Sequence, residues 1–336
     1  MDEPLKVGVI GLGRFGALHL RAWAAIGAAE VVAVSSRSVE RARELAERWS
    51  IPRTYTDWHD LVNDGDLDVV DVVTDWLRHV EPTIAALQAG KHVLVEKPVA
   101  TTLEDADRML EAWRASGRAL MVGHMLRFDP RYVQLVERVH AGELGEVVTL
   151  FCRRNVARSH FAEHAKYTPL LETGVHDIDV CRWLTGEEVV TVWAQKSHTL
   201  DERIADTYWL WLEFTGGSLA VVETSWLLPD RARTALHGEL ELIGTKGVAR
   251  VQLPGFGLEL WTADGTQTPD LAAWPEVDGL VTGMLRQELS YFAQCILEGR
   301  EPDRVQPEDA RAALATALAG IDSAERGEPV VPAPAP

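Results

Sequence analysis

The sequence LKVGVIGLGRFG at residues 5–16 joins an apolar, β-branched run to three closely spaced glycines. The apolar run has the length and composition of a strand that is buried on both faces of a parallel sheet. Apolar residues at helical spacing follow, so Gly11, Gly13 and Gly16 occupy a strand-to-helix turn in a G-x-G-x-x-G pattern. Gly11 permits the tight turn, Gly13 lets the backbone approach a pyrophosphate, and Gly16 lets helix and strand pack closely. The stretch therefore predicts a βα unit that binds a dinucleotide at its helix N-terminus.

The alternation of strands and helices continues to about residue 123. Further strands are expected at 30–34, 67–73, 92–95 and 119–122, with helices between them. This pattern predicts an α/β Rossmann domain over residues 1–123, with a doubly wound parallel sheet. Strands separated by turns then follow one another, and helices are expected at 281–297 and 307–325. They predict an α+β domain over 124–336 with an open, mostly antiparallel sheet and an extended or disordered tail at 329–336.

The composition is that of an ordinary globular protein, and it narrows the range of partners. The 336 residues suggest about two domains, and 46% hydrophobic with 25% charged residues is typical of folded chains. The net charge of −18 argues against nucleic acid and anionic membranes as partners, because the summed field repels phosphates. Three scattered cysteines indicate neither a disulfide framework nor a zinc site, and no signal peptide or membrane span is evident. We therefore expect a cytoplasmic protein.

The second expected strand ends in Ser35-Ser36-Arg37-Ser38. In a dinucleotide-binding fold this point meets the adenosine ribose, where a carboxylate would bind the 2′-hydroxyl of NAD. No carboxylate stands here, whereas the hydroxyl of Ser36 and the guanidinium of Arg37 suit a 2′-phosphate. A polar loop that only caps the next helix is the alternative, and both interpretations can hold together. The sequence favours NADP, with NAD as the alternative, and Arg14 in the glycine turn can add positive charge near the phosphates.

Lys97 stands between Glu96 and Pro98 at the end of the strand expected at 92–95. Proline fixes its own φ and restricts the residue before it, so this lysine is held more stiffly than one on an open loop. Glu96 can orient the lysine or keep it charged. Because ligands of parallel sheets bind at the carboxyl ends of the strands, Lys97 is a candidate site residue.

A helix expected over residues 170–184 carries a second polar group. Glu172, His176 and Asp179 fall at i, i+4 and i+7 and therefore on one helical face. Two flanking carboxylates would raise the basicity of the imidazole, which suits proton transfer. Glu172 and His176 could also bind zinc, but no third ligand is evident, so no metal is expected.

Three stretches together resemble the Gfo/Idh/MocA family of oxidoreductases, the relatives of glucose–fructose oxidoreductase and inositol dehydrogenase. They are GLGRFG near the N-terminus, GKHVLVEKP around Lys97 and ETGVHDID around His176. The resemblance covers essentially the whole chain. It implies a Rossmann domain, an open antiparallel sheet, tightly held NAD(P), and hydride transfer at a secondary alcohol of a sugar, sugar derivative or cyclitol such as inositol.

The resemblance also implies a set of site residues. Lys97 matches the lysine that touches the reacting hydroxyl and the nicotinamide ribose, and His176 matches the catalytic histidine. Glu172 occupies the position of a usual aspartate and is one methylene longer, which changes the geometry of the proton relay. The substrate is implied to meet Lys97, Arg127, Asn155, Thr173, His176 and Asp179. With Ser36 and Arg37, the residues expected at the cofactor are Gly11, Gly13, Arg14, Phe15, Gly16, Thr74, Trp76, His79, Glu96 and Lys97.

One loop departs from the family pattern. The usual T-P-N followed by a histidine is replaced by Thr74-Asp75-Trp76, with His79 three residues further on. Loss of the proline changes the loop, and Trp76 is expected to shape the nicotinamide or substrate side.

Hydride transfer assigns roles to these residues. His176 is expected to act as general base, and the ammonium of Lys97 to stabilise the developing alkoxide on the same oxygen. A ketoreductase acting on a nucleotide-linked keto-sugar and a non-catalytic NADP-binding regulator are the alternatives. A homodimer or homotetramer through the C-terminal sheet is expected, because Trp209 and Trp211 suit a face covered by another subunit. The core of the domain itself is the other place for these two tryptophans.

Overall fold

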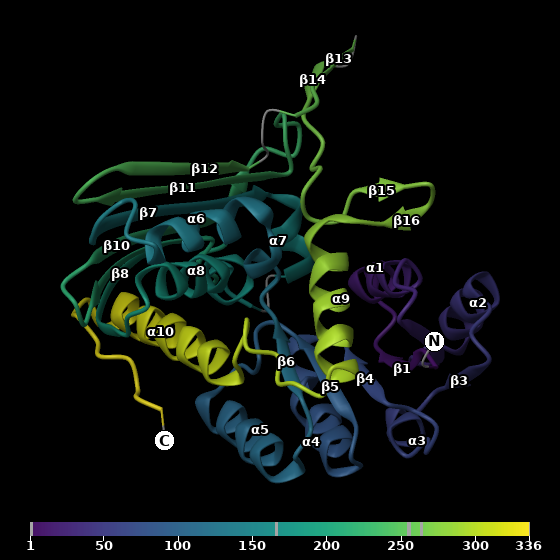
Figure 1. The fold of residues 1–336 in the computed structure, drawn as a ribbon. Helices are drawn as coiled ribbons and strands as arrows, with labels where there is room; N and C mark the ends of the chain where they lie inside the picture. Colours follow the sequence, from purple (N-terminus) through teal and green to yellow (C-terminus); the bar gives the residue numbers. More distant parts are fainter. Residues whose placement is uncertain (1–2, 165–166, 254–256, 263–264, 336) are drawn as a thin grey trace. The chain divides into compact units, whose positions relative to one another are not determined.

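The computed structural model describes residues 3–164, 167–253, 257–262 and 265–335 (Figure 1). The chain forms two compact units, and neither is one continuous segment. Residues up to 128 group with 273–311, and residues 129–272 group with 312–335. The expected domain boundary between residues 123 and 124 stays a prediction. The units differ from it mainly at 273–311, where helix α9 (Gly283–Leu297) packs on α1 (Arg14–Trp23) of the first unit.

The first unit is built on a six-stranded parallel sheet in the order β3-β2-β1-β4-β5-β6. Its strands are β1 (Leu5–Ile10), β2 (Ala29–Ser35), β3 (Arg53–Tyr55), β4 (Val69–Val72), β5 (His92–Glu96) and β6 (Leu120–Gly123). Strands β4 and β6 are buried throughout, and β1 and β5 are buried except for one residue each, as expected of a sheet with helices on both faces. The strand order reverses between β1 and β4, and ligands of such sheets bind beside this reversal at the carboxyl ends. The expected Rossmann fold is confirmed.

The other elements of the first unit are short connections and helices. Besides α1 and α9 they are α2 (Val39–Trp49), α3 (Trp58–Val62), α4 (Val80–Gln88), α5 (Leu103–Ser116), the 3-10 turns Trp76–Arg78 and Met125–Phe128, and the hairpin β15 (Glu276–Val277) and β16 (Leu280–Val281). Side chains cap the starts of α2 and α5, where Ser38 and Thr102 accept hydrogen bonds from backbone N–H groups. Such caps satisfy groups that a helix start otherwise leaves without a partner.

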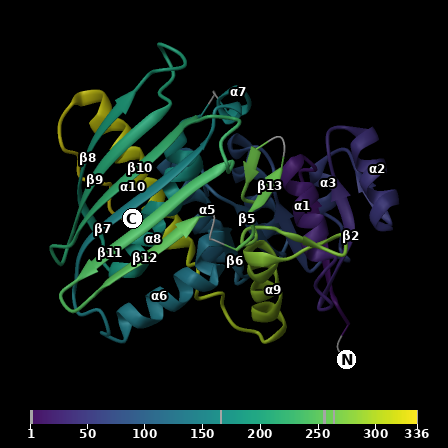
Figure 2. The ribbon, with the colours of Figure 1, turned by 90° about the horizontal axis from the view of Figure 1, so that it is seen from above.

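The second unit contains a six-stranded sheet in the order β12-β11-β7-β10-β9-β8, whose strands lie side by side in Figure 2. Its strands are β7 (Val147–Ala157), β8 (Val189–Ser197), β9 (Thr207–Phe214), β10 (Leu219–Leu228), β11 (Leu236–Gly244) and β12 (Val248–Leu253). All neighbours are antiparallel except β7 and β10, which run parallel. The expected mostly antiparallel sheet is confirmed.

The helices of the second unit lie against one face of this sheet. They are α6 (Pro130–His140), α7 (Ser159–His164), α8 (Val175–Thr185) and the part of α10 (Pro307–Arg326) that follows residue 311, and a separate hairpin is formed by β13 (Leu260–Thr262) and β14 (Gly265–Gln267). Burial alternates along β8 and β9, which leaves Trp193, Trp209 and Trp211 between 43% and 46% exposed. The alternative that Trp209 and Trp211 lie in the core is therefore wrong.

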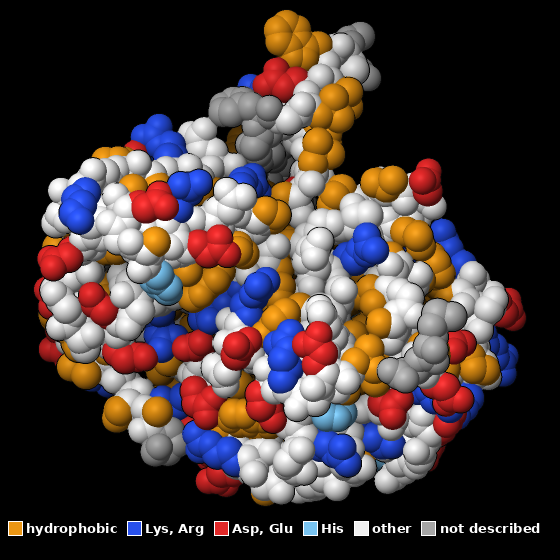
Figure 3. Space-filling view, in the orientation of Figure 1, with side chains coloured by type: hydrophobic (Ala, Val, Ile, Leu, Met, Phe, Trp, Pro, Cys, Tyr) orange, Lys and Arg blue, Asp and Glu red, His pale blue; other side chains and the backbone are white. Residues whose placement is uncertain are grey.

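The start of the C-terminal tail is bound to the sheet of the second unit. Val330 pairs with Val192 in an antiparallel bridge, so the start of the expected tail is tied to β8, and residue 336 lies outside the described residues. Acidic and basic side chains are interspersed on the face drawn in Figure 3. No helix within the described ranges has both the length and the apolar composition needed to cross a membrane.

Candidate functional site

The glycine turn has the geometry that its spacing predicts. Gly11 has a φ of +101°, and a Cβ there would lie 2.4 Å from the carbonyl oxygen of Val73. A Cβ on Gly16 would lie 2.0 Å from the oxygen of Gly11, which explains the close packing of α1 on the turn. At Gly13 a Cβ would meet no atom within 4 Å, so the space above this residue is open. Helix α1 begins here without a side-chain cap, so its start suits a phosphate.

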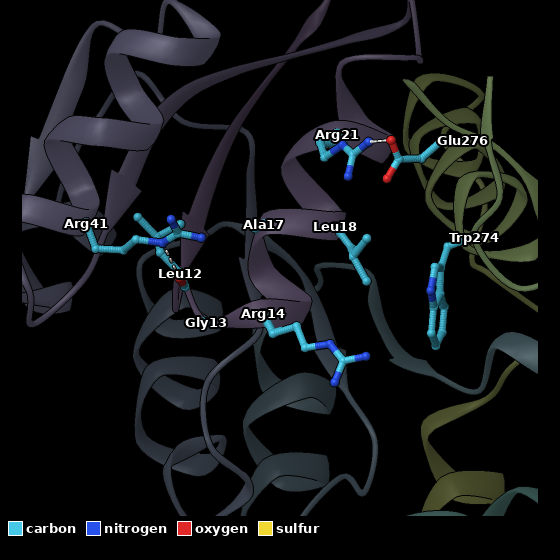
Figure 4. A pocket seen from close by; sticks show the side chains of 9 residues that line it. All are labelled: Leu12, Gly13, Arg14, Ala17, Leu18, Arg21, Arg41, Trp274 and Glu276. Atoms are coloured by element: carbon cyan, nitrogen blue, oxygen red, sulfur yellow. Dashed lines mark hydrogen bonds and ion pairs between the residues drawn. The ribbon is translucent and has the colours of Figure 1, made fainter. Parts of the chain in front are cut away.

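A pocket of the first unit opens beside the glycine turn (Figure 4). Its lining residues are Leu12, Gly13, Arg14, Ala17, Leu18, Arg21, Arg41, Trp274 and Glu276. In Figure 4 the side chain of Arg14 extends from the start of α1 toward the side on which Trp274 lies. Trp274 also packs against the ring of Phe15, with ring centroids 5.5 Å apart, and Glu276 forms an ion pair with Arg21. The pocket therefore combines a helix N-terminus, three arginines and an indole, which suits a nucleotide with phosphates.

The end of β2 presents polar groups near this pocket. Ser36 accepts a hydrogen bond from the backbone N–H of Ser38, and Arg37 is exposed. Arg41, one turn into α2, donates from Nε to the backbone oxygen of Leu12 at 3.3 Å. This contact holds its guanidinium against the glycine turn. Sequence reasoning missed Arg41, although its place three residues after Ser38 in the expected helix could have shown it.

The loop after β4 and the end of β5 are joined by buried contacts. The imidazole nitrogens of His79 lie 3.0 Å from the oxygen of Pro98 and 3.2 Å from that of Thr74. Burial lowers the pKa of His79, so the ring is neutral near pH 7. The ammonium nitrogen of Lys97 lies 5.4 Å from the centre of the Trp76 ring, a cation–π distance. The structure thus brings Thr74, Trp76, His79 and Lys97 together at the carboxyl edge of the sheet.

Glu96 holds the backbone at this point. Its Oε2 accepts a hydrogen bond from the N–H of Lys97 at 3.1 Å, and the residue is only 7% exposed. A Cβ on Gly123, at the end of the neighbouring strand β6, would lie 2.4 Å from Glu96 Oε1. The carboxylate therefore fills the space that a side chain at position 123 would need.

In the second unit, Glu172 and Thr173 lie in a π-turn, Leu170–Gly174, that leads directly into α8. The expected single α-helix over 170–184 is thus divided at this point, and π-turns are frequent at functional sites. The indole N–H of Trp226 donates to Glu172 Oε2 at 2.5 Å, and His164 Nε2 lies 3.7 Å from Glu172 Oε1. Trp226 is fully buried. Sequence reasoning missed these two contacts of Glu172, because Trp226 and His164 come from other elements.

The remaining residues expected at the substrate differ in their surroundings. His176 and Asp179 are buried on α8, and the hydroxyl of Thr173 lies 2.6 Å from that of Thr224. Asn155 on β7 donates to Glu223 at 2.7 Å. Arg127 belongs to the first unit, where it donates to the oxygen of Arg304 at 2.8 Å and pairs with Asp309 at 3.0 Å.

Helix α8 is anchored by an ion pair next to His176. Arg154 of β7 binds Asp177 through two hydrogen bonds of 3.0 and 2.8 Å, and both side chains are buried. The position of His176 within this unit therefore depends on a pair of charges that stabilise each other away from water. Among the residues that the structure describes, no group of three His, Cys, Asp or Glu could hold a metal ion.

Comparison with known proteins gives a consistent result. A model described as an oxidoreductase family with an NAD-binding Rossmann fold matches residues 5–124, and a Gfo/Idh/MocA C-terminal domain model matches residues 132–250. The myo-inositol 2-dehydrogenase of Thermotoga maritima is 34% identical over 256 residues, which cover 72% of this chain and 74% of that protein. The scyllo-inositol 2-dehydrogenase (NAD(+)) of Bacillus subtilis is 28% identical over 344 residues, which cover 98% of this chain and 97% of that protein. Among solved structures, the crystal structure of a probable dehydrogenase from Thermotoga maritima matches this chain with a TM-score of 0.83 at 28% identity. The match covers 97% of this chain and 98% of that chain.

Proposed function

Because the chain belongs to the Gfo/Idh/MocA family of oxidoreductases, we propose that it moves a hydride between a nicotinamide dinucleotide and a secondary alcohol or ketone. The substrate is a sugar, a sugar derivative or an inositol. Two relatives that are named as inositol 2-dehydrogenases support a cyclitol within this range. The observation that carries the proposal is Lys97, which lies at the carboxyl edge of the Rossmann sheet, held by Glu96 and beside Trp76.

The chain's own residues bind the cofactor and handle the proton. The glycine turn and Arg14 hold the pyrophosphate, since α1 begins without a side-chain cap and Gly13 leaves its approach open. The bound nicotinamide supplies or accepts the hydride. Lys97 donates a hydrogen bond to the reacting oxygen and stabilises its negative charge. His176 accepts the hydroxyl proton during oxidation, and Glu172, bound by Trp226, orients the imidazole and passes the proton outward.

We propose NADP as the preferred cofactor. Ser36 and Arg37 follow β2 where a carboxylate would otherwise bind the 2′-hydroxyl, and Arg41 adds a second guanidinium beside the glycine turn. A 2′-phosphate gains from both arginines and meets no acid at the end of β2. The Bacillus subtilis relative is named for NAD(+), so cofactor choice is a property in which this chain would differ from it.

We also propose that a second copy of the chain covers the open face of the β7–β12 sheet. Trp193 pairs directly with Trp211, and the same row continues through Val221 to Phe151. Exposed apolar rows of this kind are unusual on a surface that stays in water. Beside it, Arg153 pairs with Glu223 at 3.0 Å, so both charge signs are present. Around a two-fold axis the same patch occurs on both copies, so each contact between two different residues is made twice.

The proposed chemistry is tested by Lys97→Ala and His176→Ala. We expect each to lower turnover about 10²- to 10⁴-fold, as removal of a proton-transfer or charge-stabilising group does. Cofactor affinity, measured by nicotinamide fluorescence, should change little. Turnover is followed at the nicotinamide absorbance band with a panel of inositols, sugars and nucleotide-linked keto-sugars, using both cofactors.

Two controls accompany these variants. Lys6→Ala changes a lysine of β1 far from the strand's carboxyl end, and His198→Ala changes an exposed histidine. Both should retain turnover and cofactor binding. Near-normal turnover in Lys97→Ala and His176→Ala would contradict the assigned roles. Cofactor binding without turnover on any substrate of the panel would favour a regulator instead.

A further inference from the structure

Four ionisable side chains of the first unit, His19, Asp71, Glu96 and Glu288, form a buried group. They come from α1, β4, β5 and α9, and all are fully buried except Glu96, which is 7% exposed. Nδ1 of His19 lies 2.8 Å from Asp71 Oδ2, and its Nε2 lies 3.4 Å from Glu96 Oε1. One imidazole therefore stands between two carboxylates in the interior of the Rossmann domain.

This arrangement suits the charged form of His19. A neutral imidazole has one N–H, whereas both ring nitrogens of His19 face a carboxylate. Burial lowers the pKa of His19, but the charges of Asp71 and Glu96 and the hydrogen bond with Asp71 outweigh it and raise the pKa to about 10. Burial and the charge of Glu96 also raise the pKa of Glu288 well above its usual range, which favours the protonated form of this acid.

The group continues to Lys97 through the carboxylate of Glu96. One oxygen of Glu96 faces His19, and the other accepts the hydrogen bond from the Lys97 N–H. Gly123 closes the opposite side, because a Cβ there would collide with Glu96 Oε1. The carboxylate is therefore held between α1 and β6. Without His19 it would be a buried anion with no cation on its inner side, which costs free energy and favours protonation or rotation.

We propose that His19 is a positioning residue for Lys97: its imidazolium holds the Glu96 carboxylate in the orientation that fixes the Lys97 backbone. This inference rests on the proposed function, in which Lys97 acts on the reacting oxygen. His19 is the last residue of the pattern G-x-G-x-x-G-x-x-H, and this positioning role gives a reason for a histidine at that place. The ring of His19 also packs against Phe15 at a centroid distance of 5.0 Å, and Asp71 accepts a further hydrogen bond from the Trp23 N–H at 2.7 Å.

A double-mutant cycle separates positioning from general damage. Turnover and cofactor affinity are measured for the wild type, His19→Gln, Lys97→Ala and the double variant. We expect His19→Gln to lower kcat about tenfold, with KM for the substrate and cofactor affinity changed less than about threefold. In the Lys97→Ala background the same substitution should change kcat less than about twofold, because residues that act as one unit are not additive.

The controls keep the outcomes distinct. Trp23→Phe removes the hydrogen bond from Trp23 to Asp71 but leaves His19 and Glu96 facing each other. It should lower the melting temperature while kcat stays within about twofold of the wild type. If His19→Gln does not fold, Asp71→Asn, which removes the charge opposite His19 Nδ1, replaces it in the cycle with the same expectation.

Two results would overturn the inference. An equal fold-loss from His19→Gln in both backgrounds would mean that His19 acts independently of Lys97. A loss of kcat in Trp23→Phe that matches its loss of stability would mean that packing alone explains the effect. Near-normal turnover in Lys97→Ala alone would contradict the proposed function itself, whatever His19 does.

Discussion

Arg37 and Arg41, both near the end of β2, differ in their exposure and in their contacts with the rest of the protein. Arg37 is exposed, whereas Arg41 is half-buried and bound through Nε to the oxygen of Leu12. Arg41 also pairs with Glu44 at 2.9 Å, so part of its charge is already offset. A 2′-phosphate would therefore meet an exposed guanidinium at Arg37 and one that is already held by the backbone at Arg41. This division makes the cofactor preference testable one residue at a time.

We predict that Arg37→Asp reverses the preference for NADPH over NADH. A carboxylate at this point repels a 2′-phosphate and can accept a hydrogen bond from a 2′-hydroxyl. The ratio of the two dissociation constants, measured by fluorescence titration, should swing at least about tenfold, equivalent to about 1.4 kcal/mol. Arg41→Ala should weaken NADPH binding more than NADH binding.

Arg43→Ala is the matched control, since Arg43 is an exposed arginine of the same helix that does not line the pocket. It should leave both dissociation constants unchanged. Equal or tighter binding of NADH by the unaltered protein would refute the proposed preference.

At the scale of elements, the start of α1 has two glycines with different reasons to be glycine. Gly13 has a φ of −67° and open space where a Cβ would stand, so the fold itself tolerates a side chain there. Gly16 does not, because its Cβ would lie 2.0 Å from a backbone oxygen. We propose that the first glycine serves the ligand, whereas the second serves the packing of helix on turn.

We therefore predict that two alanine substitutions affect different properties, one the binding of the dinucleotide and the other the stability of the fold. Gly13→Ala should leave the melting temperature nearly unchanged and weaken dinucleotide binding at least about tenfold, because a methyl group blocks the phosphate from the backbone. Gly16→Ala should lower the free energy of unfolding by about 1–3 kcal/mol, as overpacking does. Thermal unfolding with and without cofactor distinguishes the two. Unimpaired cofactor binding by Gly13→Ala would argue against a phosphate at this helix start.

Elements with strong periodicity were predictable from sequence, whereas contacts between distant segments were not. The helix at 307–325 and the strand at 92–95 follow from local pattern and are found within a residue of the expected ends. Neither pattern indicates that 273–311 groups with the first unit, since helix α9 has the same periodicity in either place. The π-turn at 170–174 and the contact of Glu172 with Trp226 depend on packing, which periodicity does not encode.

On the scale of the whole molecule, the net charge of −18 and the apolar row on the β7–β12 sheet act in opposite directions. A large net charge keeps copies of a chain apart at long range, and salt screens this repulsion within about 10 Å at 0.1 M ionic strength. Burial of apolar area acts only at contact, and about 800 Å² from each partner is usual for a stable interface. Association through this sheet is therefore expected to strengthen as salt is added.

We predict that the wild type is a dimer or tetramer and that Trp211→Glu dissociates it into monomers. Trp211 is 44% exposed, lies opposite Trp193 and neighbours Val221, so a charge there falls within the apolar row. Sedimentation velocity at micromolar concentration should show the wild type as an oligomer and the variant shifted to the monomer. Trp261→Glu is the control, because Trp261 is 80% exposed but belongs to the separate β13–β14 hairpin. A monomeric wild type, or an oligomer that Trp261→Glu dissociates and Trp211→Glu does not, would place the interface elsewhere.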